Sequence, residues 1–439
     1  MKSYPTLSDQ LLRQKLEELQ TKEDLLRLIN EVLEDNFYRY TRLKVTMKQL
    51  SYYASSYTAA DKQRNRYHTF FIRKKSGSAR KILAPQHTLK YIQFALNKVL
   101  QATFEPQAQA FGFVRGKNIV DNAALHAGRN YVLNLDLKDF FPSVYFRRIK
   151  VMLEQPPFNL SSHREPLAYL IANLCTDEGV LPQGAPTSPV LTNIICQRLD
   201  RKLAEIAAQH SAVYSRYADD ITFSSNDFVY STRFRQRIER VIARERFVIN
   251  ESKTRLQEKG YRQEVTGLTV NEGVNPGRKY RKSYRTLLYL YKTKGRDAAL
   301  DYFSKRLPQH MKKSHMVNIE QVIEGKYQFM KLVLKEKAPL HPFGKTGKTK
   351  RFPIYDTDED HRLKMVWKKR QNVEDLVEEE EALQKEIENI NLHLNELKAA
   401  NLAVPLSSSS GPSLVLDDIL QTWENEGFEK AMEVLTGKK

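Results

Sequence analysis

Two adjacent aspartates between two strand-like runs constrain the fold of this chain more than any other feature. Asp219 and Asp220 follow the apolar residues 212–214 and precede a second run at 221–223. Neighbouring side chains point to opposite faces of a β-strand, so both carboxylates can serve one site only from a tight hairpin turn. A bound metal ion would stabilise two negative charges placed so close together. The sequence therefore predicts a hairpin with a metal site at its turn.

A third carboxylate follows another run of apolar residues. The sequence Val-Leu-Asn-Leu-Asp at 132–136 predicts a buried strand that ends at Asp136. Mg2+ takes carboxylate and phosphate oxygens, and a pair of such ions can hold the attacking and leaving oxygens of an in-line displacement. Three acids at strand ends therefore indicate nucleotidyl transfer. An isolated Asp-Asp pair would more often be an ordinary turn, because aspartate forms local hydrogen bonds there.

The order of the motifs carries more information than any single motif. After Asp136 come Leu-Pro-Gln-Gly-Ala-Pro-Thr-Ser-Pro at 181–189, Tyr-Ala-Asp-Asp at 217–220, Asn-Glu-Ser-Lys-Thr at 250–254 and Val-Thr-Gly at 265–267. This order resembles the palm of the reverse transcriptases. Asn-Ala-Ala-Leu-His at 122–126 and the Val-Thr-Gly run resemble two elements of the bacterial retron reverse transcriptases. The resemblance covers residues from about 30 to about 335. It implies an α+β fold with the right-hand architecture of fingers, palm and thumb.

The resemblance implies a polymerase site with two Mg2+ ions. The residues expected at the metal are Asp136, Leu137, Asp219 and Asp220. Asp136 and Asp219 are the main ligands, whereas Asp220 supports the site electrostatically. Lys253 is the fourth catalytic residue, and it would neutralise or protonate the departing pyrophosphate.

A second group of residues is expected to bind the incoming deoxynucleoside triphosphate. The group consists of Lys74, Lys75, Arg80, Phe141, Gln183 and Gly184. The three basic residues belong to a predicted fingers hairpin, with strands at 67–72 and 79–85. Gln183 would contact the nascent base pair. Phe141 would clash with a ribose 2′-hydroxyl and so select deoxynucleotides. A single phenylalanine is more often a core residue, and a basic hairpin tip is more often only solvated.

A third group is expected to bind RNA. Its members are Asn122, His126, Val265, Thr266, Gly267, Arg278, Lys279, Arg281 and Lys282. The first five form the two retron-like elements. The last four open a helical section in which basic residues alternate with aromatic ones, a pattern that can follow a phosphate backbone and stack on bases. The alternative for these four is a solvated basic face on an ordinary helix bundle.

The chain is expected to contain eight segments. They are an N-terminal helical extension (1–60), fingers (61–135), a palm with interleaved fingers helices (136–274), a thumb (275–338), a basic connector (339–371), a coiled-coil helix (372–400), a flexible linker (401–413) and an amphipathic tail (414–439). The coiled-coil helix repeats apolar residues in steps of three and four, apart from Glu380 at one core position, and has an acidic outer face. It could pair with a copy of itself, fold onto the body or bind another protein, and the sequence leaves all three open.

Composition agrees with a polyanionic partner. The formal net charge is +19 and the pI is about 9.6, and both favour long-range, salt-sensitive attraction to phosphates. The two cysteines, Cys175 and Cys196, lack the spacing of metal ligands and are expected to be buried thiols in a reducing compartment. The start of the chain lacks the apolar core of a signal peptide, and no run is long enough to cross a bilayer. We therefore expect a cytoplasmic bacterial protein with no membrane contact.

The resemblance also implies partners and a biological role. A cognate noncoding RNA would supply both the template and a priming guanosine, and synthesis would begin at a 2′-hydroxyl. The DNA product would then form a branched hybrid with the RNA, and an effector protein would use it in antiphage defence. The first alternative is another bacterial defence-associated or group II intron-like reverse transcriptase, with a different RNA and priming mode. The second is a nucleic-acid-binding scaffold without activity, which would have no physical need for the three carboxylates, Gln183 and Lys253 together.

Overall fold

The computed structural model describes residues 7–37, 44–55, 66–73, 79–307, 318–337, 339 and 341–343. The chain divides into two units, Met1–Lys345 and Thr346–Lys439, and every described residue belongs to the first unit. The coiled-coil helix, linker and tail expected from the sequence lie outside the described residues. Most of the expected basic connector does so as well.

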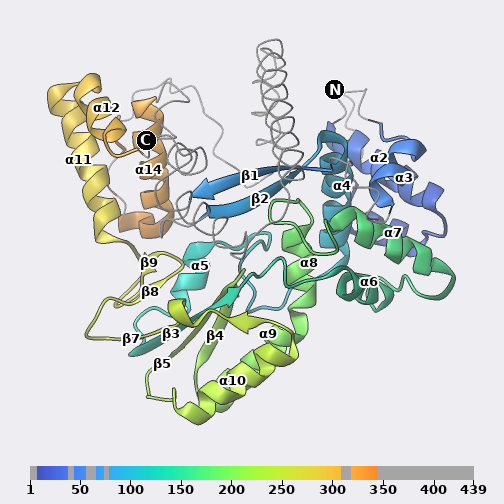
Figure 1. Ribbon diagram of the computed structural model, residues 1–439. Helices are drawn as coiled ribbons and strands as arrows, with labels where there is room; N and C mark the ends of the chain where they lie inside the picture. The colour runs from blue at the N-terminus through green and yellow to red at the C-terminus, as the bar shows by residue number, and fades with distance from the viewer. Residues whose placement is uncertain are drawn as a thin grey trace, which may run out of the picture. The chain divides into compact units, whose positions relative to one another are not determined.

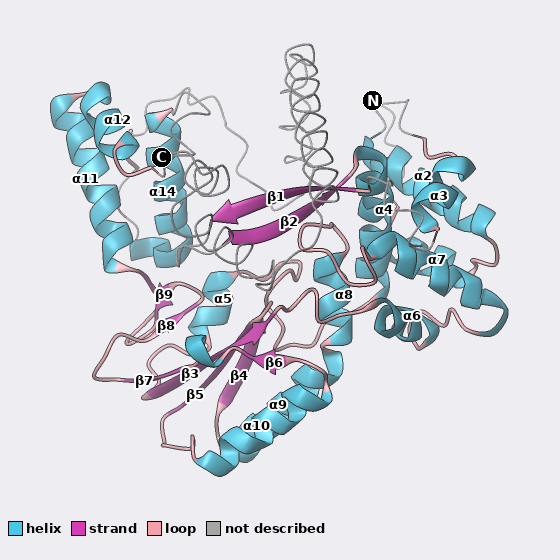
Figure 2. Ribbon diagram, viewed as in Figure 1, coloured by secondary structure: helices cyan, strands magenta, loops and turns pink. Residues whose placement is uncertain are grey.

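An antiparallel sheet of five strands forms the centre of the first unit (Figure 2). Its strands are β3 (Tyr131–Lys138), β4 (Val213–Tyr217), β5 (Asp220–Ser225), β6 (Val248–Ile249) and β7 (Arg255–Glu258). β5 lies between β4 and β3, and β6 and β7 share the other side of β3. β3 occupies the middle because Val132, Leu135 and Leu137 are all buried, which suits a strand with neighbours on both sides.

The alternation of side chains gives this sheet two different faces. Asp136 and Asp220 are directly opposite each other in the β3–β5 register, so they share what we call the carboxylate face. Phe223 belongs to the other face, which we call the helix face. It is covered by α9 (Gln197–Gln209) and α10 (Thr232–Arg244), and the ring of Phe234 in α10 packs edge-on against Phe223 at 5.7 Å.

Part of the carboxylate face is covered by a small apolar cluster. It joins α5 (Ile119–Ala124) to a sheet of three short strands, β8 (Glu264–Val265), β9 (Leu268–Thr269) and β10 (Asn275–Pro276). Val265 is fully buried there, and Val333 of α14 (Ile319–Leu334) joins the same cluster. The cluster therefore connects the central sheet to the helices that follow it in the chain.

Helices that precede the fingers hairpin in the chain and helices that follow it pack together at one end of the unit. They are α1 (Asp9–Glu17), α2 (Lys22–Phe37), α3 (Met47–Ala54), α4 (His87–Thr103), α6 (Phe146–Glu154), η2 (Ser162–Arg164), α7 (Glu165–Cys175) and α8 (Ser188–Ile195). Thr21 and Asp24 cap the start of α2, since the Thr21 hydroxyl donates to the Asp24 carboxylate and the Asp24 N–H donates back to the Thr21 hydroxyl oxygen. Cys175 and Cys196 are buried free thiols, as expected.

The predicted fingers hairpin is also confirmed. β1 (Tyr67–Arg73) and β2 (Ala79–Pro85) form a separate two-stranded ribbon that extends above the central sheet in Figure 1. Most of its side chains are exposed, and Phe71 is 66% exposed. The ribbon therefore owes little of its stability to a core of its own, so its backbone contact with the loop that contains Gln183 becomes important.

Within the described residues, three further α-helices follow the small sheet. They are α11 (Arg278–Lys294), α12 (Arg296–Ser304) and α14, and η4 (Lys335–Lys337) follows α14. Tyr284, Leu287, Ile319 and Ile323 form their shared core. None of the helices in the described ranges is both long and apolar enough to span a membrane.

Candidate active site

The two adjacent aspartates lie at a tight hairpin turn, as predicted. Tyr217 of β4 pairs with Asp220 of β5, so only Ala218 and Asp219 form the turn. Ala218 has a φ of 59°, in the left-handed region that a two-residue hairpin needs and that residues with a side chain adopt at a cost. The surrounding structure must hold this turn in place.

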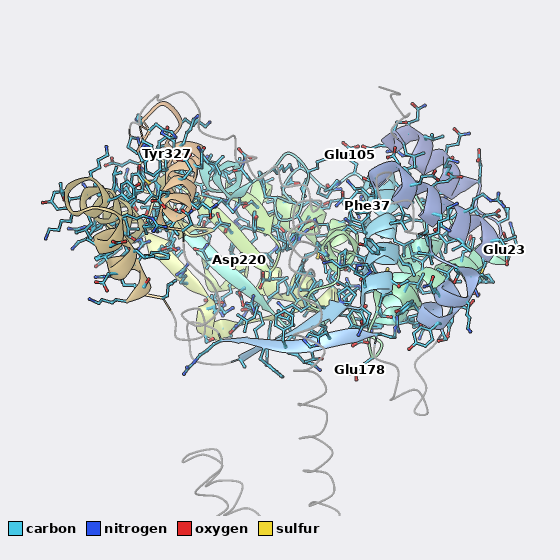
Figure 3. All side chains as sticks on the ribbon, turned by 90° about the horizontal axis from the view of Figure 1, so that it is seen from above. Glu23, Phe37, Glu105, Glu178, Asp220 and Tyr327 are labelled. Atoms are coloured by element: carbon cyan, nitrogen blue, oxygen red, sulfur yellow. The ribbon has the colours of Figure 1, made fainter. Side chains whose placement is uncertain are left out.

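β3 brings the third carboxylate to the same place. Asp136 lies directly opposite Asp220, and the N–H of the next residue, Leu137, donates to the carbonyl oxygen of Asp219 at 3.0 Å. The structure therefore brings Asp136, Asp219 and Asp220 together at one edge of the carboxylate face. Figure 3 shows Asp220 in the middle of the unit, between Tyr327 of α14 and Phe37 of α2.

Asp136 already has two partners. Its carboxylate accepts from the Lys253 Nζ at 2.9 and 3.0 Å and from the Asn250 side-chain amide at 3.1 Å, while the Asn250 N–H donates to the Asp136 carbonyl oxygen at 2.7 Å. Asn250 directly precedes η3 (Glu251–Lys253), and Lys253 is the last residue of η3. Lys253 thus faces the site, as the motif order predicts, but its contact here is with an aspartate.

The electrostatics of the turn favour a cation. Burial, followed by the neighbouring carboxylates of Asp219 and Asp136, raises the pKa of Asp220 to about 6. Burial also raises the pKa of Asp219, and the charges of Lys253 and Arg80 only partly oppose this. Asp220 can still be reached by solvent, so the surrounding atoms remove part of its water without enclosing it. A positive charge placed between these carboxylates would keep them ionised.

The donor set fits Mg2+, with one restriction. Within the described part of the chain, no three acidic, histidine or cysteine side chains are placed to hold a metal ion by themselves. Mg2+ usually keeps several waters and binds one or two carboxylates plus substrate phosphates, so it does not need a complete protein cage. Asp219 and Asp220 could supply such oxygens, whereas the carboxylate of Asp136 is in contact with Lys253 in this structure. The assignment of Leu137 and of two ions stays a prediction.

A buried ion pair on the helix face holds the turn, and the sequence reasoning missed it. The Arg216 guanidinium donates to both carboxylate oxygens of Asp200 in α9 at 2.7 Å, to the Asn193 side chain at 3.1 Å and to the Ala218 carbonyl oxygen at 3.2 Å. Tyr214 donates to the same Asp200. The sequence signal for this pair was a charged residue at a position where the pattern predicts burial. Arg216 shares a strand face with Tyr214, and Asp200 directly follows Leu199.

The segment before α5 supports the same turn from a second direction. A Cβ added to Gly112 would lie 2.4 Å from the Ala218 nitrogen, so only glycine allows this approach. The Gly112 carbonyl oxygen accepts from the Asn193 side chain at 2.9 Å, and the Phe111 N–H donates to the Arg216 carbonyl oxygen at 2.8 Å. The catalytic turn is therefore packed against backbone as well as against a buried charge.

The predicted nucleotide-binding residues gather where the fingers hairpin meets the central body. The Leu83 N–H of β2 donates to the Gln183 carbonyl oxygen at 2.9 Å. Gly184 has a φ of 136°, and a Cβ there would lie 2.7 Å from the Leu83 carbonyl oxygen. Arg80 of the same strand is close enough to Asp219 to affect its pKa. Lys74 and Lys75 lie outside the described residues.

Phe141 is half-buried. Its ring centroid is 6.2 Å from that of Phe113, which is 48% exposed, and 5.5 Å from that of Phe140, which is buried. Phe140 packs against Phe247. The two adjacent phenylalanines thus have different environments, and of the two only Phe141 is partly accessible to solvent. Its role in sugar selection stays a prediction.

The structure corrects the prediction that Asn122 and His126 contact RNA. His126 is fully buried, with its two ring nitrogens 2.7 Å from the hydroxyl oxygens of Ser215 and Ser224. Asn122 is also buried, and its side-chain oxygen has no hydrogen-bond partner among the described residues. Burial lowers the pKa of His126 to about 3, so it is a neutral bridge between β4 and β5.

The Val-Thr-Gly element needs a similar correction for one of its residues. Val265 is fully buried in the apolar cluster and cannot contact RNA through its side chain. Thr266 and Gly267, with φ values of 47° and 80°, form the two-residue turn between β8 and β9. The Thr266 hydroxyl donates to the Ile119 carbonyl oxygen at 3.1 Å. The two retron-like elements are therefore neighbours in space, and Gly267 is exposed beside them.

The basic residues at the start of α11 are exposed, as an RNA contact requires. Arg278, Lys279, Arg281 and Lys282 all lie on the surface, whereas Tyr284 is buried in the helical core. The helix contains no acidic residue. Its exposed face therefore carries an uncompensated positive charge.

Comparisons with known proteins identify relatives of this chain. Residues 72–270 match the family described as reverse transcriptase (RNA-dependent DNA polymerase). The chain is 40% identical to the retron Mx65 reverse transcriptase of Myxococcus xanthus, over 51% of this chain and 55% of the relative. It is 37% identical to the retron Mx162 reverse transcriptase of the same organism, over 47% of each chain.

A third relative is matched over more of its length. The retron Ec86 reverse transcriptase of Escherichia coli is 30% identical, over 57% of this chain and 75% of the relative. The chain therefore belongs to the retron reverse transcriptases, which are RNA-directed DNA polymerases. It spans about half the length of the two Myxococcus relatives.

Proposed function

We propose that this protein copies part of a cognate structured noncoding RNA into DNA, using deoxynucleoside triphosphates. The observation that carries the proposal is the meeting of Asp136, Asp219 and Asp220 at one edge of the sheet, opposite the fingers hairpin. In this reaction the primer hydroxyl oxygen forms a bond with the α-phosphorus, and the bond from that phosphorus to the leaving pyrophosphate breaks. Two bound Mg2+ ions would supply charge stabilisation for both oxygens.

The residues of the chain have separate tasks in this proposal. Asp219 and Asp220 would hold the cations at the turn, and the buried Arg216 keeps the turn in position. Lys253, which contacts Asp136 in this structure, would neutralise or protonate the departing pyrophosphate through its Nζ. Gln183 and Arg80 orient the nucleotide, while the Phe141 ring excludes a 2′-hydroxyl.

We extend the proposal to the mode of priming and to the biological role. The relatives support a start at a 2′-hydroxyl of the RNA, which would give a branched RNA–DNA hybrid that an effector protein uses in antiphage defence. The exposed face of α11 and the Thr266–Gly267 turn are the proposed RNA contacts, in place of the buried Asn122, His126 and Val265. The bacterial cytoplasm, where RNA and nucleotides occur together, is the proposed location.

We also propose a division of labour along the chain. α1–α3 form an N-terminal extension, β1 and β2 the fingers hairpin, the central sheet the palm, and α11–α14 the thumb. The segment from residue 372 onward would be a separable element for a homo-oligomer or for the effector. Truncation before Asn372 should then lower oligomer mass or weaken effector binding and leave primer extension intact. Loss of primer extension with unchanged assembly would show that the segment supports the catalytic body.

The experiment that tests the function uses the purified protein and the nucleic acid that copurifies with it from bacterial cells. We expect DNA joined to RNA through a 2′,5′ linkage, so that a debranching enzyme releases a shorter DNA free of RNA. The same protein should extend a DNA primer on a poly(rA) template. DNA without an RNA branch would refute the priming mode alone, whereas absence of any primer extension would refute the polymerase function.

A further inference from the structure

The helix face of the sheet carries a stripe of arginines that the proposed reaction does not use. Arg233, Arg237, Arg240 and Arg244 follow one another at i, i+4, i+7 and i+11 along α10. This spacing places all four on one side of an α-helix, over a length of roughly 16 Å at the usual rise per residue. We call these four residues the arginine stripe. The buried residues Phe234, Ile238 and Ile242 lie on another side of the helix, against the sheet.

The stripe has few negative neighbours. Arg233, Arg240 and Arg244 are exposed, and none of the three forms an ion pair with a carboxylate within the described part of the chain. Among the described residues, the polar contacts of the Arg237 guanidinium are with the uncharged Gln209 side chain and a ring nitrogen of His210. On a different side of the same helix, Arg235 pairs with Glu239 and Glu251. The acidic residues of this region thus neutralise Arg235 and leave the stripe unneutralised.

The adjacent helix α9 extends this positive surface. Arg201 is exposed and has no carboxylate partner among the described residues, whereas Arg198 pairs with Glu245 at 3.0 Å. Glu205 is the exposed acid of α9. The two helices lie side by side below the strands in Figure 1. Positive charges therefore outnumber negative ones over this surface.

The position of the stripe separates it from the polymerase site. Asp136 and Asp220 point to the carboxylate face, whereas α10 packs on the helix face through the contact of Phe234 with Phe223. A template–primer held at the aspartates therefore lies on the opposite side of the sheet. The stripe needs a different ligand, or a different part of the same one.

From this arrangement we infer that the arginine stripe binds the phosphate backbone of the structured part of the RNA partner. Arginine presents a rigid fork of donors that matches phosphate oxygens, and A-form RNA is bound largely through its shape and backbone. The regular spacing along a straight helix suits a series of phosphates better than a single acidic side chain. The inference rests on the proposed function, because that function supplies the RNA. It adds a second RNA surface that anchors the molecule while its template segment moves through the polymerase site.

The test compares two triple variants with equal loss of charge. One is Arg233→Gln, Arg240→Gln and Arg244→Gln. The control is Lys44→Gln, Lys48→Gln and Arg147→Gln, three exposed residues that also lack carboxylate partners within the described ranges. The binding probe is the RNA that copurifies with the wild-type protein, refolded and end-labelled, titrated at several salt concentrations. Primer extension on a short poly(rA)–oligo(dT) duplex is measured in parallel.

The stripe variant should bind the RNA roughly tenfold or more weakly at low salt, and the slope of log Kd against log salt should fall by about three. The control variant should keep the wild-type slope. Both should extend the short duplex at rates within about twofold of the wild type, which shows that the fold is intact. If the stripe variant lost stability, the single variant Arg240→Gln would be used to test the inference. Its slope of log Kd against log salt should fall by about one.

Equal affinities and slopes for the stripe and control variants would overturn the inference, and would leave an acidic protein surface as the ligand class to be examined. An equal loss in both variants would also overturn it, because the effect would then be one of net charge. Failure of the wild-type protein to extend a primer would refute the proposed function instead, and the RNA-binding comparison would still be readable.

Discussion

Two aspartate–cation pairs lie on opposite faces of the central sheet, and they differ in nearly every physical respect. On the helix face, Arg216 and Asp200 are 0% and 1% exposed, and they form two parallel hydrogen bonds of 2.7 Å. On the carboxylate face, the Lys253 side chain is 57% exposed and reaches an Asp136 side chain that is 10% exposed. Both pairs contact the catalytic turn or the strand beside it.

The two pairs differ in how firmly they hold their partners. The Arg216–Asp200 pair fixes the position of the turn, whereas the Lys253–Asp136 pair can separate. A buried bidentate pair leaves an uncompensated charge in the interior when one partner is lost, so it fixes the turn rigidly. A lysine that is more than half exposed gains little from its partner and can leave at low cost. The ion pair on the helix face therefore holds the turn that contains Asp219. In the proposed reaction, the exposed Lys253 would let Asp136 exchange lysine for a metal and substrate.

The largest effect is expected on the carboxylate face. Asp136→Asn and Asp219→Asn should each lower nucleotide incorporation by roughly 1,000-fold or more, because each removes a charge that stabilises the metal and the transition state. The free energy of unfolding should change by less than about 1 kcal/mol, since Lys253 is exposed. Single-turnover primer extension and urea unfolding measure the two quantities.

Asp227→Asn is the matched control, because Asp227 is an exposed acid in the loop after β5. It should leave incorporation within about twofold of the wild type. Incorporation above a tenth of the wild-type rate in Asp136→Asn would show that this carboxylate is not a metal ligand.

The opposite result is expected on the helix face. Asp200→Asn should lower the free energy of unfolding by about 3–5 kcal/mol, because Arg216 is left buried without a carboxylate. Glu205→Gln, at an exposed position of the same helix, should change it by less than about 0.5 kcal/mol. Urea unfolding of the purified variants measures both. A similar small change in the two variants would mean that Asn193 and the Ala218 carbonyl oxygen satisfy Arg216 without Asp200.

The sequence was sufficient for the three carboxylates and Lys253, and insufficient for the buried contacts on both faces of the sheet. The hairpin turn, the strand of Asp136 and the approach of Lys253 all follow from short runs in a fixed order, where local pattern and chemistry agree. Arg216 and Asp200 are 16 residues apart and belong to different elements, so their pairing depends on tertiary packing. The same limitation explains the error at His126. A histidine in a motif suggests a ligand, whereas its burial depends on two serines about 90 residues further along the chain.

A smaller effect should distinguish two adjacent aromatic residues. Phe141→Ala should lower the preference for deoxynucleotides over ribonucleotides by about 10- to 100-fold, because the ring that would clash with a 2′-hydroxyl is removed. Phe140→Ala, in the buried contact with Phe247, should instead reduce the free energy of unfolding by about 3–5 kcal/mol and keep the preference. Incorporation ratios from competing nucleotides measure the first effect. An unchanged ratio in Phe141→Ala would remove the ring from sugar selection.

The smallest effect concerns the protonation of His126, a buried histidine on the carboxylate face of the sheet. Burial lowers the pKa of His126 to about 3, from an ordinary value of about 6.5. Below pH 6.5 the unfolded chain therefore binds a proton that the folded chain does not. The contribution of neutral His126 to the free energy of unfolding is therefore complete above pH 6.5. It is lost as the pH falls toward 3, by up to about 1.4 kcal/mol per pH unit.

His126→Gln removes this titration, so the stability advantage of the wild type over the variant should shrink as the pH falls from 6.5 to 5. Urea midpoints at pH 7.5, 6.5, 5.5 and 5 provide the comparison. A constant difference between the wild type and His126→Gln would mean that His126 takes up a proton within the folded sheet. The segment 122–126 would then be open enough for His126 to reach an RNA phosphate. His126 would in that case belong to the adaptable surface of the protein and not to its rigid interior.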